Sequence, residues 1–289
     1  MAEAQLQDYP SLFSLKGKIA VVTGGSRGLG LHAASAFLQA GASKVFISSR
    51  DVAACEEACE ALNRLPNRSS PDAIAIPVPA DSSNLAGVTQ LFKQVEKHTD
   101  RVDILLANAG ATWAESIDTH SDEAFASVMD LNVRAVFNTV RLFCPLLEKA
   151  GSVQDPSRII ITASVAAVSV VTVGKIGTYG YSASKAAVVH LGRNLAVELG
   201  PRHITTNSIC PGYFPTKMTD VLLGLPGAAD KIAGANPMGR LGVPEDIAGV
   251  VVFLASRAGA HVNGETIAID GGALWVRGEL ALLDSLIKL

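Results

Sequence analysis

Cysteine is scarce in this chain, and its spacing offers little for a disulfide framework or a metal site. Four cysteines occur among 289 residues, at positions 55, 59, 144 and 210. Cys55 and Cys59 lie four residues apart in a predicted helix, which makes a metal pair conceivable, but no second cysteine or histidine pair accompanies them at ligand spacing. We therefore predict reduced, unpaired thiols and no bound metal.

The sequence also lacks a dominant block of like charge and a long apolar run. Its net charge is −3, which argues against a nucleic-acid-binding surface. The longest apolar stretch, residues 159–173, is too short for a membrane span, and residues 1–18 contain no apolar segment of signal-peptide length. We expect a soluble, cytoplasmic protein with neither a nucleic-acid nor a membrane partner.

Strand and helix patterns alternate along most of the chain, in a composition that is 48% apolar and 18% charged. This alternation predicts an α/β fold, in which a parallel sheet is covered by helices on both faces. No linker or internal repeat divides the chain. We therefore predict one domain at residues 17–273, preceded by a leader at 1–16 and followed by an extension at 274–289. The predicted strands cover residues 19–22, 45–49, 73–78, 102–107, 158–163, 203–209 and 266–269.

The first predicted strand leads into a glycine-rich turn. The segment Thr23-Gly24-Gly25-Ser26-Arg27-Gly28-Leu29-Gly30 lies between this strand and a helix predicted from about residue 29 to 39. Glycines permit the tight turn and a close approach of a ligand, and the N-terminus of the helix offers free N–H groups and a positive dipole end. We predict a phosphate-binding turn, with an empty βα turn as the alternative.

The second predicted strand ends at Ser49 and Arg50, where a dinucleotide-binding fold meets the adenosine ribose. An acidic residue there would bind the ribose 2′-hydroxyl, whereas a hydroxyl with Arg50 and Arg27 suits a 2′-phosphate, so NADP is predicted over NAD. Asp81 follows the third predicted strand. It either accepts a hydrogen bond from adenine or caps the next helix, in competition with residues 82–84.

Three further polar residues are candidates for the site, two just after predicted strands and one within a predicted helix. Asn108, in Asn108-Ala109-Gly110 after the fourth strand, can pin a loop, and its small neighbours leave room for a ligand. Asn132 lies within a long helix predicted over residues 121–149 and needs a polar partner, either in a structural network or as a holder of catalytic water. Ser164 stands at the carboxyl end of the fifth strand, where ligands of open α/β sheets gather.

Tyr181 and Lys185 are four residues apart in a predicted helix that ends near residue 199. This spacing places both side chains on one face. A positive charge beside the phenol would lower its pKa toward the working range of an acid–base catalyst. By itself the pair is also compatible with a packed tyrosine and a solvated lysine.

Taken in order, these motifs resemble the short-chain dehydrogenase/reductase family over about residues 15–275. The resemblance implies a single-domain Rossmann fold with a seven-stranded parallel sheet, usually in a homo-oligomer, either a tetramer or a dimer. It implies hydride transfer between NADP(H) and a carbonyl or alcohol. Within the family, residues 211–219 and 237–240 look like those of β-ketoacyl reductases of the rhamnolipid-pathway type and of fungal reductases of specialised metabolites.

The family's catalytic roles carry over by position. Tyr181 would be the general acid in reduction, and Lys185 would lower its pKa and hold the nicotinamide ribose. Ser164 would bind the substrate oxygen, and Asn132 would position a water in a proton relay. The residues implied in cofactor binding are Gly24, Ser26, Arg27, Gly28, Leu29, Gly30, Ser49, Arg50, Asp81, Asn108, Ala109, Gly110, Tyr181, Lys185, Pro211, Gly212 and Thr216.

We expect NADPH-dependent reduction of a small-molecule ketone to a secondary alcohol, beneath a lid formed by residues 213–236. The alternatives are a polyol or alcohol dehydrogenase working oxidatively and a non-catalytic NADP-binding scaffold or sensor. The segment between Ser164 and Tyr181 is longer than is usual in the family, and the resemblance implies that it lies over the substrate. Acyl, polyketide, aromatic and sugar ketones all remain open as substrates.

Overall fold

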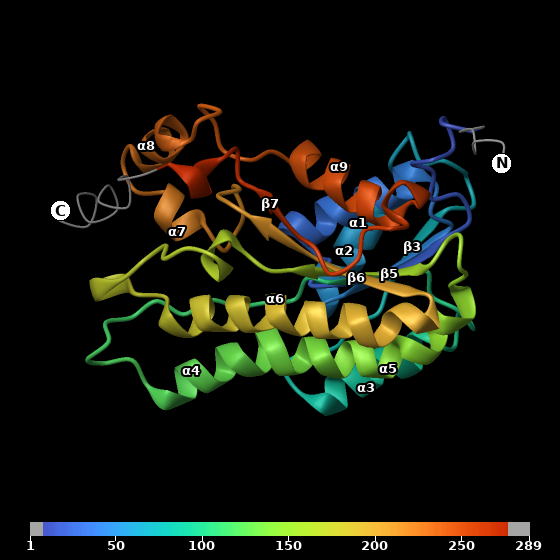
Figure 1. The fold of residues 1–289 in the computed structure, drawn as a ribbon, viewed down its shortest axis with the longest axis horizontal. Helices are drawn as coiled ribbons and strands as arrows, with labels where there is room; N and C mark the ends of the chain where they lie inside the picture. Colours follow the sequence, from blue (N-terminus) through green and yellow to red (C-terminus); the bar gives the residue numbers. More distant parts are fainter. Residues whose placement is uncertain (1–7, 277–289) are drawn as a thin grey trace, which may run out of the picture.

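The computed structural model describes residues 8–276 and contains a seven-stranded parallel sheet (Figure 1). The sheet order is β3-β2-β1-β4-β5-β6-β7, which confirms the predicted Rossmann-type fold. The strands are β1 (Ile19–Thr23), β2 (Lys44–Ser48), β3 (Ile74–Pro77), β4 (Ile104–Ala107), β5 (Ser157–Thr162), β6 (Ile204–Pro211) and β7 (Thr266–Ile269).

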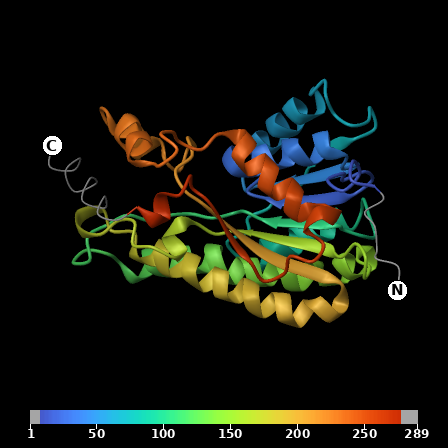
Figure 2. The same cartoon turned by 45° about the horizontal axis from the view of Figure 1, so that its top comes forward.

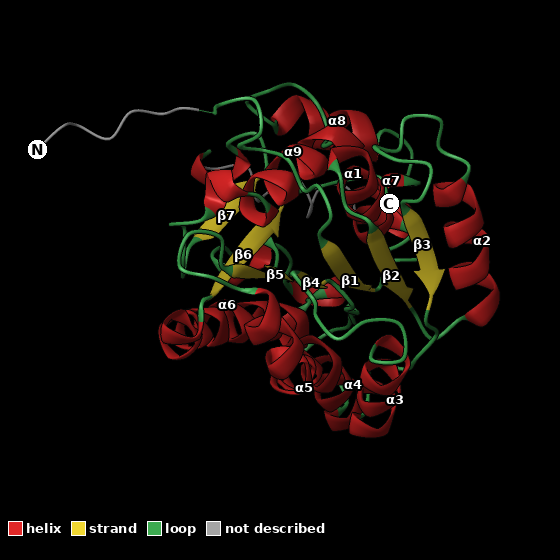
Figure 3. Ribbon diagram, turned by 90° about the vertical axis from the view of Figure 1, so that its right-hand side faces the viewer, coloured by secondary structure: helices red, strands yellow, loops and turns green. Residues whose placement is uncertain are grey.

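Helices cover both faces of the sheet, as Figure 3 shows end-on. Buried apolar side chains of α1, α2 and α9 pack on one face, and those of α3, α5 and α6 pack on the other. The central strands are buried on both sides, which explains the continuous apolar runs of β1 and β4. The helices are α1 (Gly28–Ala40), α2 (Val52–Asn63), α3 (Leu85–Val95), α4 (Asp122–Met129), α5 (Ala135–Ala150), α6 (Tyr179–Leu199), α7 (Asp220–Leu223), α8 (Ala228–Ala235) and α9 (Pro244–Ala255).

The strand order reverses between β1 and β4. From β1 the chain builds outward to β2 and β3, and then returns to place β4 on the other side of β1. Thr23 at the end of β1 pairs in register with Ala107 at the end of β4. In open α/β sheets the crevice beyond such a reversal is where ligands bind.

The long helix predicted over residues 121–149 is interrupted. Helix α4 ends at Met129, a π-helical turn covers Asp130–Arg134, and α5 then continues to Ala150. A π turn inserts one extra residue into a helical turn, so it shifts the hydrogen-bonding pattern, and such turns are frequent at functional sites. Asn132 lies within this turn.

The predicted leader contacts the domain over the part that the structure describes. Leu15 is fully buried in the core, and its N–H donates to the carbonyl of Ala40 (2.8 Å). The N–H of Ala258 donates to the carbonyl of Leu12 (3.1 Å). At the other end, most of the predicted extension, residues 277–289, lies outside the described residues.

The prediction of unpaired thiols is confirmed, because Cys55, Cys59, Cys144 and Cys210 are all buried and free. Between residues 8 and 276, no group of three or more side chains is placed to hold a metal ion. Over the same residues, no helix has both the length and the apolar character that crossing a membrane requires.

Candidate active site

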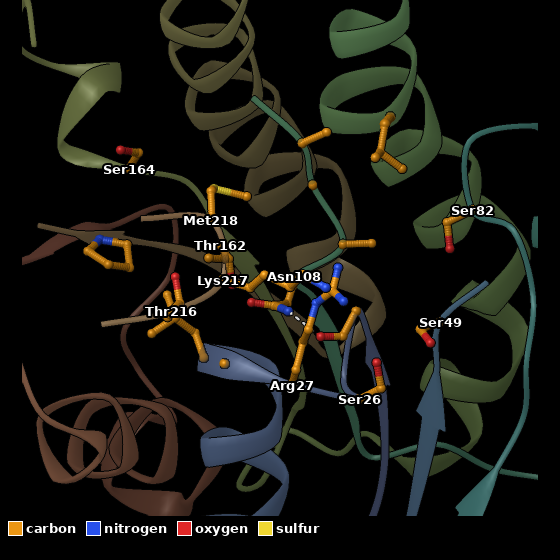
Figure 4. Close-up of a pocket in the computed structure, with 18 of the residues that line it drawn as sticks. Ser26, Arg27, Ser49, Ser82, Asn108, Thr162, Ser164, Thr216, Lys217 and Met218 are labelled. Carbon is orange, nitrogen blue, oxygen red and sulfur yellow. Dashed lines mark hydrogen bonds between the residues drawn. The ribbon is translucent and has the colours of Figure 1, made fainter. Parts of the chain in front are cut away.

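A cavity of about 670 Å³ opens beyond the carboxyl ends of the central strands. All the predicted site residues line it except Gly30 and Asn132. Figure 4 shows Ser49 and Ser82 at one side of this cavity, Ser164 and Thr216 at the other, and Arg27 and Asn108 between them. Segments that are far apart in the sequence therefore meet in one elongated site.

The glycine-rich turn forms the floor of the cavity, and three of its glycines are required by geometry. Gly24 and Gly28 have φ values of 62° and 55°, a left-handed conformation that favours glycine. Gly30, in the first turn of α1, lies against the carbonyl of Gly24. A Cβ added to Gly30 would overlap that carbonyl and lie 2.6 Å from Nδ2 of Asn108.

Asn108 fixes the turn to the end of β4. Its side-chain Nδ2 donates to the carbonyl of Gly24 (2.9 Å) and more distantly to that of Thr23 (3.2 Å), while its backbone N–H donates to Oγ1 of Thr23 (3.0 Å). The pinning role predicted from the residue type is thus seen directly. The turn is held open for a ligand by hydrogen bonds within the protein.

At the other end of the cavity, two arginines and two carboxylates line the wall. Asp51, next to Arg50, uses its carboxylate to accept the N–H of Ala54 (3.1 Å) at the N-terminus of α2. Arg27 and Arg50 are exposed in the cavity wall. This region of the site therefore presents two guanidinium groups and the hydroxyl of Ser49, together with the carboxylate of Asp81, which interacts with Arg50.

Asp81 does not cap the helix that follows it. Helix α3 is capped by Asn84, whose side chain accepts the N–H of Gly87 (2.9 Å). Asp81 instead accepts the N–H of Ser83 (3.0 Å) and lines the cavity. These hydrogen bonds from Ser83 hold the pKa of Asp81 below its usual range, so an ionised carboxylate faces the site.

Asn132 lies behind the cavity wall with its side chain fully engaged. Its Oδ1 accepts the N–H of Ala111 (2.9 Å), and its Nδ2 donates to the carbonyl of Ala111 (2.9 Å) and to Oγ of Ser184 (2.9 Å). The structural network predicted for this buried amide is therefore present. It joins the segment after β4 to helix α6, and the water-holding role stays a prediction.

Ser164, Tyr181 and Lys185 meet at the inner end of the cavity. Tyr181 lies in the first turn of α6, and Lys185 Nζ lies 5.6 Å from the centre of the Tyr181 ring. The ammonium is buried and donates to the carbonyl of Thr162 at the end of β5 (2.7 Å). Sequence reasoning missed Thr162, because a main-chain acceptor has no residue signature.

The electrostatics differ from those predicted. Burial raises the pKa of the Tyr181 phenol, and the Ser164 hydroxyl only partly opposes this rise. Burial also lowers the pKa of Lys185 to about 8. Removal from water disfavours the charged form of each group, and this burial effect decides the net direction of both pKa shifts. The effect of Lys185 on the pKa of Tyr181 stays a prediction.

Thr216 lies in the segment predicted to act as a lid, residues 213–236, and lines the cavity. Its Cγ2 lies 3.3 Å from the point where a Cβ on Gly28 would be, so the start of the lid is packed over the glycine turn. The N–H of Thr216 donates to Oγ1 of Thr219 (3.0 Å). Lys217 and Met218, which follow it and also line the cavity, were missed in the sequence because nothing distinguishes them from other surface residues.

Substituting Gly30 with alanine tests the floor of the site. Because the added methyl would overlap the carbonyl of Gly24, we expect G30A to lose about 1–3 kcal/mol of stability and to bind NADPH poorly. The matched control is G249A in α9, where an added Cβ meets nothing within 4 Å. That variant should be as stable as wild type or more so, by up to about 1 kcal/mol. Thermal unfolding and NADPH titration measure both, and equal behaviour of the two variants would contradict the close approach.

The lowered pKa of Lys185 predicts a pH dependence of stability. Between pH 8 and 10.5 the unfolded chain keeps the Lys185 proton while the native protein has lost it, so the free energy of unfolding rises with pH. Relative to K185M, wild type should gain on the order of 2–3 kcal/mol across this range. Urea unfolding of both proteins at a series of pH values gives this difference, and a flat or falling one would show that the native ammonium is not destabilised by burial.

Most of the chain matches a known protein family. The sequence profile of the family described as "Enoyl-(Acyl carrier protein) reductase" matches residues 24–273. The rhamnolipids biosynthesis 3-oxoacyl-[acyl-carrier-protein] reductase of Pseudomonas aeruginosa is 40% identical over 260 residues, which cover 90% of this chain and 97% of that protein.

A fungal relative and a solved structure agree with this. The short-chain dehydrogenase/reductase PhomF of Diaporthe leptostromiformis is 32% identical over 286 residues, which cover 92% of this chain and 94% of that protein. The structure described as a Pseudomonas aeruginosa RhlG/NADP active-site complex superposes with a TM-score of 0.83 at 39% identity, over 91% of this chain and 98% of that one. The chain therefore belongs to the short-chain dehydrogenase/reductase family of oxidoreductases.

Proposed function

We propose that this protein is an NADPH-dependent reductase that converts a ketone to a secondary alcohol, with Tyr181 as the proton donor. The observation that carries this proposal is the position of Tyr181, Lys185 and Ser164 in the same cavity as the glycine turn and the two arginines. Acid–base groups at one end and a basic, hydroxyl-bearing region at the other match the two ends of a nicotinamide dinucleotide phosphate.

The residues of the cavity fit this cofactor in chemistry and in shape. Gly24 and Gly28 leave the turn without side chains where a pyrophosphate would approach the backbone and the N-terminus of α1. Arg27, Arg50 and Ser49 would hold the 2′-phosphate, and Asp81 would accept a hydrogen bond from adenine. The related Pseudomonas aeruginosa structure is a complex with NADP, which supports the same choice.

The bound nucleotide would supply the hydride; the chain's own groups would handle the proton and the charge. Ser164 donates a hydrogen bond to the ketone oxygen, and Tyr181 transfers its phenolic proton to that oxygen as negative charge develops. Lys185 is held by the carbonyl of Thr162 close to the Tyr181 ring, where its ammonium stabilises the phenolate left behind.

Burial raises the pKa of Tyr181, so the buried phenol holds the proton that reduction requires. The oxidative alternative uses the same groups in reverse, with the phenolate as the base. A non-catalytic scaffold is disfavoured because it has no use for a buried ammonium beside a buried phenol.

Removing the phenolic hydroxyl separates binding from chemistry. We expect Y181F to bind NADPH with nearly unchanged affinity and to reduce ketones about 10²- to 10⁴-fold more slowly, the range for a general acid. The control is Y179F: Tyr179 lies two residues earlier on α6, stacks against His120 and is not part of the cavity wall. Fluorescence titration and NADPH oxidation rates are the readouts. A Y181F protein that loses binding but keeps its chemistry would refute the assigned role.

Reversing the charge of Arg50 tests the cofactor preference. R50D should weaken NADPH binding by about tenfold or more while changing NADH binding much less, because only NADPH carries the 2′-phosphate. R64D makes the same charge change on an exposed arginine at the far end of α2 and should leave the NADPH-to-NADH ratio as in wild type. Equal losses for both nucleotides in R50D would remove the phosphate argument.

A further inference from the structure

Exposed apolar side chains gather around one end of the cavity. Single exposed apolar residues are ordinary on protein surfaces, but a group of them marks a place where an apolar ligand or partner is bound. Here they lie on three segments, residues 112–117, 168–173 and 218–225, which we call the mouth. The exposed members are Trp113, Ile117, Val168, Val170, Val173, Met218, Val221 and Leu225.

Each segment of the mouth is attached directly to the cavity. The first follows Ala111, the second lies between Ser164 and Tyr181, and the third begins at Met218, all of which line the cavity. Figures 1 and 2 show the three segments at the same end of the molecule, with α7 and α8 facing the other two. The N–H of Glu115 donates to the carbonyl of Gly177 (3.0 Å), which joins the first two segments into one wall.

The added length between Ser164 and Tyr181 contributes three of these side chains. The segment forms two short 3-10 turns, Val165–Ala167 and Gly174–Ile176, and leaves Val168, Val170 and Val173 more than half exposed. Valines in an exposed loop gain nothing from solvent, so their apolar surface needs another explanation. A substrate lying against them would remove that surface from water.

The charges near the mouth are predominantly acidic. The stretch from Glu115 to Glu123 carries four carboxylates, while Lys175 is the one charged residue between Ser164 and Tyr181. In residues 213–231 two lysines balance two aspartates. Glu115 accepts the indole N–H of Trp113 (2.8 Å), and this bond lowers its pKa, so it stays ionised. An excess of negative charge disfavours a substrate carried on a polyanion.

We propose that the substrate is a free, neutral ketone with an extended hydrocarbon body, rather than a ketone carried on a polyanionic nucleotide or carrier protein. This rests on the proposed reductase function and specifies its substrate class. The ketone oxygen meets Ser164 and Tyr181, and the hydrocarbon body lies outward along the valines of the wall and the apolar side chains of α7. The preference differs from the activity in the name of the Pseudomonas relative, whose substrate is attached to a carrier protein.

The test compares three esters of one chemical series with NADPH as the reductant. The probes are ethyl 3-oxobutanoate, ethyl 3-oxooctanoate and the coenzyme A thioester of 3-oxooctanoate. Each fully buried methylene is worth roughly a fourfold gain in binding, so kcat/KM should rise about tenfold or more from the short to the long ethyl ester. The thioester, with the same chain on a polyanion, should fall below the long ethyl ester by about tenfold.

Variants then localise the effect to the mouth. The triple substitution V168S/V170S/V173S should bring kcat/KM for the long ester down toward that for the short ester and leave the short ester unaffected. The control is V153S, an equally exposed valine in the loop before β5, at the opposite edge of the sheet, which should change neither value. The pair D118K/E123K should raise kcat/KM for the thioester selectively, and more so at low salt.

The outcomes separate the substrate class from the reductase function. If none of the three ketones is reduced, the proposed function itself fails. If the short ester is reduced and lengthening the chain changes nothing, the apolar mouth is overturned while the reductase stands. If kcat/KM for the thioester equals that for the long ethyl ester, the charge argument is overturned and a carrier-bound substrate is favoured.

Discussion

The whole site depends on how closely helix α1 approaches the end of β1. Gly30 lies against the carbonyl of Gly24, and Nδ2 of Asn108 donates to that same carbonyl from the neighbouring strand. No side chain fits between them, so the turn, the helix N-terminus and β4 are held as one unit. This contact sets the floor on which a nucleotide can lie, and Thr216 packs on the same floor from the lid. The cofactor region and the lid therefore share one support.

At the inner end of the cavity, burial raises the pKa of Tyr181 and lowers that of Lys185. Removal from water shifts the pKa of each group, and neither shift is caused by the other group alone. The carbonyl of Thr162 gives the ammonium one acceptor, and the remaining donor capacity of Lys185 faces the cavity. In the proposed reduction, a protonated phenol lies beside a cation that stabilises negative charge as it develops.

The sequence predicted this architecture well where a residue type leaves a pattern. Alternating apolar runs gave the strands, glycine spacing gave the turn, and the interval between Tyr181 and Lys185 gave their shared helix face. The sequence did not predict the features that depend on main-chain hydrogen bonds. The π turn around Asn132, the carbonyl of Thr162 and the choice of Asn84 over Asp81 as the cap of α3 each depend on backbone geometry. Long-range burial decided the direction of the Tyr181 pKa, and no local pattern reports burial of that kind.

The residues that indicate the reaction class and those proposed to select the substrate lie in different parts of the chain. The groups proposed to act on the reacting atoms lie just after β5 and in the first turn of α6, where rigid elements keep their positions. Groups that meet the rest of the substrate lie on the segments between those elements, which can change length without disturbing the sheet. The segment between Ser164 and Tyr181 begins and ends at the residues proposed to be catalytic, while its middle carries the exposed valines. Under the proposed function, these valines determine what the site accepts, and the proton donor stays on α6.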